Sequence, residues 1–193
     1  MLAHMAAKTD TSITGAAGAY FVVAELSQRG WVASPTWGNA PRTDVLAQTA
    51  DGSRLASIQV KTRNTGSFQL GSKGEQPSSR HGNEWFILVS LKAPGELPDF
   101  YVVPRDHIVA LTHYGYRAWL ARPGRNGRSH NPTTMRTIQV EEVERYKDAW
   151  DLLNSPAADA DWMIPSWVWD VAKTTSDRPA RPFKLGRYKP PPV

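Results

Sequence analysis

The sequence contains no cysteine, which excludes disulfide bonds and thiolate metal sites. It has no apolar run approaching the ~20 residues that a membrane-spanning helix needs. The first residues, from Met1 to Asp10, lack the long apolar core of a secretory signal. No segment repeats another. With 40% hydrophobic and 21% charged residues, we expect a globular chain of cytoplasmic localisation without a membrane partner.

Acidic residues are scarce in two parts of the chain. The stretch 117–136 has five arginines and no Asp or Glu. The stretch 173–193 is rich in proline and has six basic residues and one acid. With a net charge of +5, this distribution favours a polyanionic partner.

Residues 42–63 contain the most informative combination of polar side chains. Two short runs flank Ala50-Asp51-Gly52-Ser53, which is strong turn chemistry because Asp and Gly tolerate positive φ. The runs therefore predict an antiparallel hairpin. Side chains alternate between faces along a strand, so Gln59 and Lys61 share one face, which Asp44 on the neighbouring strand can reach.

This shared face has two interpretations. A carboxylate, an amide oxygen and an ammonium group that converge on a sheet can bind a hard divalent cation and a phosphate. The three side chains can also form the solvated face of an ordinary hairpin, with a weak surface ion pair between Asp44 and Lys61. Because most charged residues on strands are only solvated, the pattern alone favours the second interpretation.

A family resemblance changes this balance. Thr43-Asp44 followed by Gln59-Val60-Lys61-Thr62 resembles the signature of the PD-(D/E)XK nuclease superfamily. The Gln-Val-Lys version is similar to the branch containing group I intron homing endonucleases, and is related to Holliday-junction resolvase-like proteins. The segment from Gly15 to Trp31 resembles the opening helix of the family. Two positions depart from the pattern, since Ala19 and Gln59 stand where acidic residues are usual.

The resemblance implies an α/β fold with a restriction-endonuclease-like αβββαβ core, in which helices flank a mixed central sheet. It implies an endonuclease-like domain over residues 12–153, followed by a Trp-rich and basic, Pro-rich extension over 154–193. Mg²⁺ or Mn²⁺ would be held by the side chains of Asp44 and Gln59 and by the Val60 carbonyl. Lys61 would orient the attacking water or stabilise charge developing on the phosphate.

DNA is the partner that this resemblance implies. The residues expected to contact DNA follow the motif directly or lie in basic loops and turns. They are Arg42, Thr62, Arg63, Lys73, Arg80, Arg125 and Arg128. For those in loops, a plain solvated surface is an alternative of equal weight.

Hydrophobic spacing predicts the remaining elements. Strands are expected over 31–37, 85–91 and 100–103, and helices over 12–29, from Pro104 onward, and over 140–153. The apolar stripe expected on the first helix consists of Ile13, Ala16, Ala17, Tyr20, Val23 and Ala24. The continuously apolar strand 85–91 is expected at the centre of the sheet, covered on both faces.

The Trp-rich segment 162–169 is expected to pack on the core, with a homodimer contact or a partner site as alternatives. Residues 178–193 have little to bury and are expected to form an extended arm. Three hypotheses about function follow. The first is a metal-dependent nuclease, the second a catalytically weakened nucleic-acid-binding or interaction module, and the third an interaction protein unrelated to nucleic acid.

Overall fold

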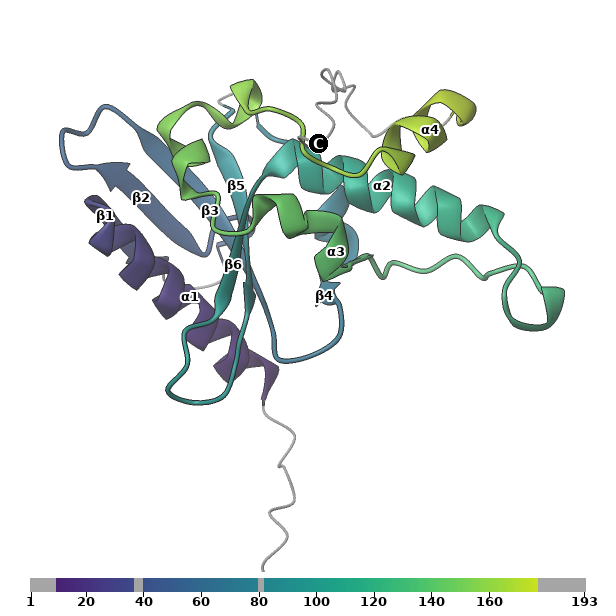
Figure 1. Cartoon of the computed structure of the whole chain (residues 1–193), viewed down its shortest axis with the longest axis horizontal. Helices are drawn as coiled ribbons and strands as arrows, with labels where there is room; N and C mark the ends of the chain where they lie inside the picture. The colour runs from purple at the N-terminus through teal and green to yellow at the C-terminus, as the bar shows by residue number, and fades with distance from the viewer. Residues whose placement is uncertain (1–9, 37–39, 80–81, 177–193) are drawn as a thin grey trace, which may run out of the picture.

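A computed structural model describes residues 10–36, 40–79 and 82–176 of the chain (Figure 1). Its centre is a five-stranded sheet in the order β1-β2-β3-β5-β6. The strands are β1 (Trp31–Pro35), β2 (Val45–Thr49), β3 (Leu55–Arg63), β5 (Glu84–Ser90) and β6 (Asp99–Pro104). Only β3 and β5 run parallel, while the other neighbours are antiparallel. The mixed sheet that the sequence predicted is therefore confirmed.

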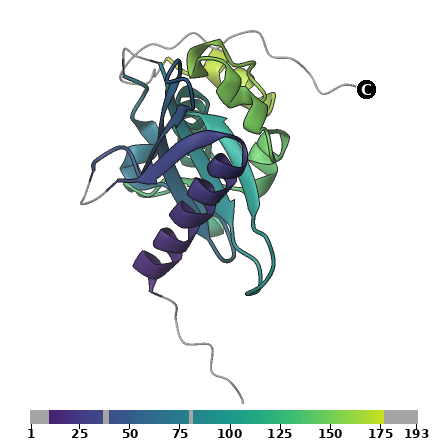
Figure 2. The ribbon, with the colours of Figure 1, turned by 90° about the vertical axis from the view of Figure 1, so that its left-hand side faces the viewer.

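Helices cover both faces of this sheet. Figures 1 and 2 show α1 (Thr11–Gln28) on one side, and α2 (Arg105–Ala121) with α4 (Trp167–Thr174) on the other. The smaller elements are the strands β4 (Phe68–Gln69) and β7 (Thr137–Ile138), the helix α3 (Val140–Val143), and the 3-10 turns η1 (Gly71–Glu75), η2 (Arg125–Gly127), η3 (Glu144–Tyr146), η4 (Trp150–Asn154) and η5 (Ala157–Asp159). No helix in the described ranges is long and apolar enough to cross a membrane.

The predicted first helix is confirmed, but its buried face is not the predicted one. Ile13 and Tyr20 are 64% and 60% exposed, and the buried row is Gly18, Val22 and Leu26. At Gly18 the helix comes so close to β3 that an added Cβ would lie 1.9 Å from Oγ1 of Thr62. Because Gly18 lies against β3, Val22 and Leu26, which follow it at intervals of four residues, also face the sheet. Ile13 and Tyr20 therefore face outward.

Substitution of Gly18 tests this close approach. We expect Gly18→Ala to lower the free energy of unfolding by about 1–3 kcal/mol, because the new methyl group collides with Thr62. Gly15 lies on the same helix with open space around it, so Gly15→Ala should raise stability by about 0.5–1 kcal/mol. Urea unfolding measures both variants, and equal stability of the two would contradict the packing at Gly18.

The predicted β2–β3 hairpin is confirmed. Gly52 has a φ of 70°, and its N–H donates to the Thr49 carbonyl at 2.9 Å. The Asp51 carboxylate accepts hydrogen bonds from Thr49 and Ser53, which closes the turn. This turn sets the register in which Val45 pairs with Ile58. Asp44 therefore stands at the start of β2, beside the middle of β3.

The strand β5 separates two hydrophobic cores, as its continuously apolar sequence predicted. All of its residues are buried. Trp85, Ile87 and Val89 face the core under α1, while Phe86 and Leu88 face the core under α2. The parallel connection from β3 to β5 contains β4 and η1 where an α-helix is usual.

The predicted helix over 140–153 is wrong. Asp148 has a φ of 50°, which interrupts the helix after α3 and η3. The N–H of Asp148 donates to the Phe100 carbonyl at 2.9 Å, and Lys147 forms a bridge with Tyr101. Hydrogen bonding to the edge strand β6 thus replaces the continuous helix that the apolar spacing indicated.

The Trp-rich segment packs on the core, as expected by default. Trp162, Ile164 and Val168 are buried in the same core as α2, β5 and β6. The Tyr146 hydroxyl accepts the N–H of Met163 at 3.0 Å and lies 2.7 Å from Nδ1 of His107. Residues up to Ala172 thus belong to the core under α2, while the expected arm over 178–193 lies outside the described residues.

Candidate functional site

A hollow of about 390 Å³ lies between the first half of α1 and the edge where β2 begins beside β3. Asp44 and Lys61, which the sequence analysis paired, both line it, together with Val60. The other lining residues are Gly15, Ala16, Ala19, Tyr20, Pro35 and Thr36. Small side chains of α1 therefore form one wall, and polar groups of the hairpin form the other.

The backbone of the hairpin fixes the Asp44 side chain. The N–H of Asp44 donates to the Ile58 carbonyl at 2.8 Å, which extends the β2–β3 ladder by one residue. Its Oδ2 then accepts the N–H of Val60 at 2.8 Å. At this end of the β2–β3 ladder the Val60 N–H thus donates to the Asp44 carboxylate, where a backbone carbonyl would accept inside the ladder. Among the described residues, Oδ1 has no hydrogen-bond partner and remains available to a ligand.

Lys61 approaches Asp44 without forming a direct ion pair with it in the described structure. Partial burial is the largest influence on the amine and lowers its pKa, while the charge of Asp44 opposes this effect. The charges of Lys73 and Arg105 lower the pKa further. The hollow therefore combines one anchored carboxylate with a partly desolvated amine, which can act on an anionic ligand.

Gln59 lies apart from this hollow, although it shares a strand with Lys61. Its side chain is buried with only 4% of the residue exposed, and Oε1 accepts a hydrogen bond from Nη2 of Arg105 at 3.0 Å. Arg105 is fully buried, and its Nε lies 2.7 Å from Oε2 of Glu84. The structure thus brings Asp44, Val60 and Lys61 together, and the metal-ligand role expected for Gln59 stays a prediction.

Sequence reasoning did not identify Glu84 and Arg105. Burial raises the pKa of Glu84, but hydrogen bonds from Arg42 and Ser79 and the charge of Arg105 together bring it below its ordinary value. Nη2 of Arg42 lies 2.6 Å from Oε2 of Glu84, and it also donates to the Pro77 carbonyl. The only sequence signal was the position of Glu84 and Arg105 at the ends of apolar strands, which does not reveal burial.

The residues expected to contact DNA divide into two groups. Arg42 belongs to the Glu84 cluster, Thr62 faces Gly18, and Arg63 donates to Oγ of Ser90 at 3.1 Å and stacks on Phe68. Lys73 and Arg128 are exposed. Arg80 and the side chain of Arg125 lie outside the described structure. The contacts of the first group already hold the fold together, and the DNA role of every residue in both groups stays a prediction.

Acid should weaken the cluster around Glu84 in a defined direction. The pKa of Glu84 is lowered in the folded protein, so its carboxylate stabilises the fold at any pH above 4.5, the ordinary pKa of a Glu carboxyl. This contribution is lost as the pH falls from 4.5 through the folded pKa. At pH 7, Glu84→Gln should cost about 3 kcal/mol because it leaves Arg105 without its anion. Thermal unfolding across pH should show the gap to wild type closing below pH 4.5.

The exposed residue Glu96 provides the control for this experiment. Glu96→Gln should follow the wild-type melting temperature at every pH. A gap between Glu84→Gln and wild type that stays constant down to pH 3 would show that the charge of Glu84 does not carry the stabilisation.

Comparison with known proteins gives similarity at the level of structure. The chain is similar to the structure of a bacterial homing endonuclease, I-Ssp6803I, with 19% identity and a TM-score of 0.45, over 78% of this chain and 98% of that one. It is also similar to Hjc, a Holliday junction resolvase from the archaeal hyperthermophile Archaeoglobus fulgidus, with 15% identity and a TM-score of 0.42, over 68% and 88%. No protein-family model and no curated protein matches the sequence.

The arrangement of the sheet and helices agrees with the mixed sheet expected from the sequence. Its mixed sheet has the order β1-β2-β3-β5-β6, with α1 on one face and α2 on the other. An Asp opens β2, and a Lys on β3 lines the same hollow. The chain thus has the mixed central sheet flanked by helices that the resemblance led us to expect.

Proposed function

We propose that the protein is a metal-dependent nuclease that hydrolyses DNA phosphodiester bonds at the hollow between α1 and β3. The observation that carries this proposal is the meeting of Asp44 and Lys61 in one hollow, at the edge where β2 leaves β3. A solvated hairpin face would not require the Asp44 carboxylate to be anchored on the Val60 N–H. The anchoring leaves one oxygen in a fixed direction, as a ligand-binding carboxylate needs.

Mg²⁺ or Mn²⁺ would be held by Asp44 and the Val60 carbonyl. When bound, such an ion polarises a phosphoryl oxygen and lowers the pKa of an attacking water. No group of three or more His, Asp or Glu side chains in the described ranges is arranged to hold a metal. With a single carboxylate, the substrate phosphate has to complete the coordination, so we expect weak metal affinity without DNA.

Lys61 contributes by holding the substrate phosphate and its charge in place. Its partly buried ammonium interacts with an anion more strongly than a solvated one does, because the local dielectric is lower. A donor at this position stabilises negative charge that develops on the phosphate during attack. The charge of Asp44, on the same hairpin, raises the pKa of this amine against the effect of burial and so favours its charged form.

Charge removal at these two positions tests the proposal. Asp44→Asn keeps an acceptor for the Val60 N–H and removes the charge, while Lys61→Ala removes the amine. We expect each to lower metal-dependent cleavage of plasmid DNA by at least about 100-fold. Melting temperatures should stay near wild type. Cleavage that is undiminished in both variants would contradict the proposal.

Exposed residues of the same types serve as matched controls. Asp151→Asn on η4 and Lys173→Ala on α4 change the net charge in the same way, far from the hollow in the chain and on other elements. Both should cleave as wild type does. Plasmid, linear and branched DNA should each be assayed with Mg²⁺, with Mn²⁺ and with chelator.

A second candidate is a nucleic-acid-binding module whose catalysis has weakened. It is favoured by the hydrogen bond between Gln59 and Arg105, which occupies the amide oxygen otherwise free for a metal. The wall of the hollow formed by Ala16 and Ala19 carries no acid either. Salt-sensitive DNA binding without cleavage in any metal would establish this module. The Trp-rich segment, which motivated an interaction protein, is largely buried in the core.

Ala19 offers a test that strengthens the site. Because Ala19 lines the hollow, Ala19→Glu adds a second carboxylate facing Asp44 and Val60. We expect tighter Mn²⁺ binding by calorimetry and half-maximal cleavage at a Mn²⁺ concentration about tenfold lower. Ala24→Glu on the exposed side of the same helix is the control. If the two variants bind Mn²⁺ equally, the hollow is not the metal site.

A further inference from the structure

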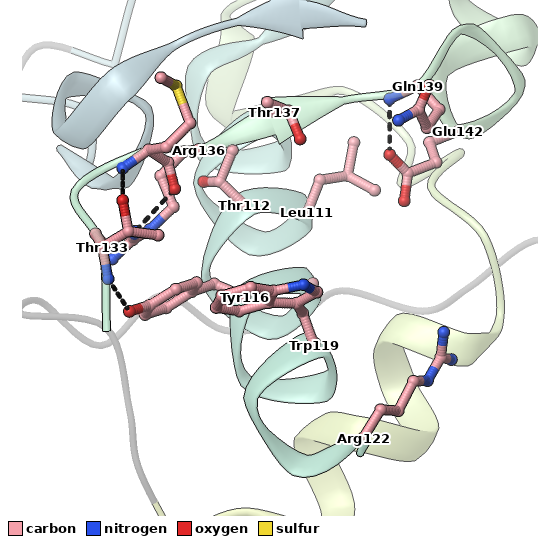
Figure 3. A pocket seen from close by; sticks show the side chains of 12 residues that line it. Leu111, Thr112, Tyr116, Trp119, Arg122, Thr133, Arg136, Thr137, Gln139 and Glu142 are labelled. Carbon is pink, nitrogen blue, oxygen red and sulfur yellow. Dashed lines mark hydrogen bonds between the residues drawn. The ribbon is translucent and has the colours of Figure 1, made fainter. Parts of the chain in front are cut away.

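A second pocket, of about 380 Å³, lies at the far end of α2 (Figure 3). Its floor is the last part of α2, and its opposite wall is the segment that leads through β7 into α3. This volume is in the range of small-ligand sites. The pocket shares no lining residue with the hollow at Asp44. Its lining mixes aromatic rings with arginines.

Aromatic rings provide a flat surface in this pocket. The rings of Tyr116 and Trp119 lie 5.7 Å apart with an angle of 20° between their planes, and both line the pocket. His130 stacks on Trp119 at 4.0 Å, yet it is not part of the pocket lining. His130 therefore covers one face of Trp119 from outside the pocket lining. Trp119 remains 37% exposed, so it offers a supported ring to a ligand.

Two arginines give the pocket a positive charge. The Arg136 guanidinium lies 3.5 Å from the Tyr116 ring centre, and its Nε donates to Oε1 of Glu75 at 2.6 Å. Arg122 lines the pocket, is exposed, and has no side-chain partner among the described residues. Arg136 is thus held rigidly, while Arg122 is available to an anion at the opening.

Polar groups face the rings across the pocket. Figure 3 shows Gln139 and Glu142 opposite Tyr116 and Trp119. An oxygen of the Glu142 carboxylate accepts the N–H of Gln139 at 2.8 Å, which caps α3 and holds this side chain in place. The pocket therefore combines a stacking surface, hydrogen-bonding groups at its far wall and a free cation at its mouth. A planar heterocycle attached to a phosphate matches these three features.

The short turn η1 supports the wall of this pocket. Oε1 of Glu75 on this turn accepts a hydrogen bond from Nε of Arg136 at 2.6 Å. Oγ1 of Thr112, which lines the pocket, donates to the Gly74 carbonyl of the same turn at 2.9 Å.

We propose that this pocket binds an unpaired nucleobase of a nucleic-acid strand, with Trp119 stacking on the base and Arg122 contacting an adjacent phosphate. The inference rests on the proposed function, because it assigns to the DNA substrate of the proposed nuclease a single-stranded region that the pocket binds. It assigns a role to the acid-free stretch 117–136, which contributes Trp119, Arg122 and Arg136 to the pocket. The ligand chemistry is shared by DNA and RNA strands.

Binding of fluorescent single strands in chelator tests the pocket independently of cleavage. The probes are labelled oligothymidylate and oligouridylate of about twelve nucleotides, with a duplex of the same length as comparison. Fluorescence anisotropy should show that Trp119→Ala binds single strands about tenfold more weakly, while Trp119→Phe keeps most of the affinity. Duplex binding should change less than twofold. Preference for one of the two probes would identify the type of strand.

Arg122 provides a second variant that leaves the aromatic packing intact. Arg122→Ala should reduce the salt dependence of single-strand binding by a slope of about 0.7, as expected for one lost phosphate contact. Arg54→Ala is the matched control, because Arg54 is exposed on the β2–β3 turn and remote in sequence from the pocket. Its salt dependence should equal that of wild type.

The outcomes separate this inference from the proposed nuclease. If wild type binds single strands in chelator but cleaves no DNA, the pocket stands and the nuclease proposal fails. If wild type cleaves duplex DNA while Trp119→Ala and Arg122→Ala bind single strands as wild type does, the pocket proposal is overturned. It is also overturned if Arg54→Ala weakens binding as much as Arg122→Ala, or if wild type binds no single strand.

Discussion

The buried guanidinium of Arg105 is the constraint on which the arrangement of the site depends. It stands at the first residue of α2 and contacts Gln59 on β3, Glu84 on β5 and the backbone carbonyl of Arg42. A fully buried charge is stable only when it is paired and hydrogen-bonded, so these partners have little freedom. The cluster therefore sets how α2 begins against the sheet, and it occupies the amide oxygen of Gln59.

Two polar side chains of β3, Gln59 and Lys61, lie in different surroundings. Gln59 and Lys61 are two residues apart on the same strand. Gln59 accepts a hydrogen bond from the buried Arg105, while Lys61 lines the hollow. Asp44 reaches the hollow because it replaces a backbone acceptor at the end of the β2–β3 ladder. The same α2 that starts at the buried cluster ends at the aromatic pocket. One helix thus joins the buried cluster to the aromatic pocket.

Local patterns predicted the parts of the fold that local chemistry controls. The Asp51-Gly52 turn and the apolar strand β5 both appear as the sequence indicated. The errors arose where distant residues compete with local preference. The approach of Gly18 to Thr62 selects a different buried face of α1, and hydrogen bonding of Asp148 to β6 interrupts the last predicted helix.

The sequence by itself determined the hairpin, its register and hence the placement of Asp44 near Lys61, because a tight turn and the two-residue period of a strand are short-range properties. It also determined that β5 is an interior strand, because an unbroken apolar run has to be covered on both faces. Only the tertiary structure decided that Gln59 pairs with Arg105, and that Trp119 lies between His130 and an open pocket. These contacts join residues far apart in the chain, and they depend on how the elements pack, which the spacing of residue types does not specify.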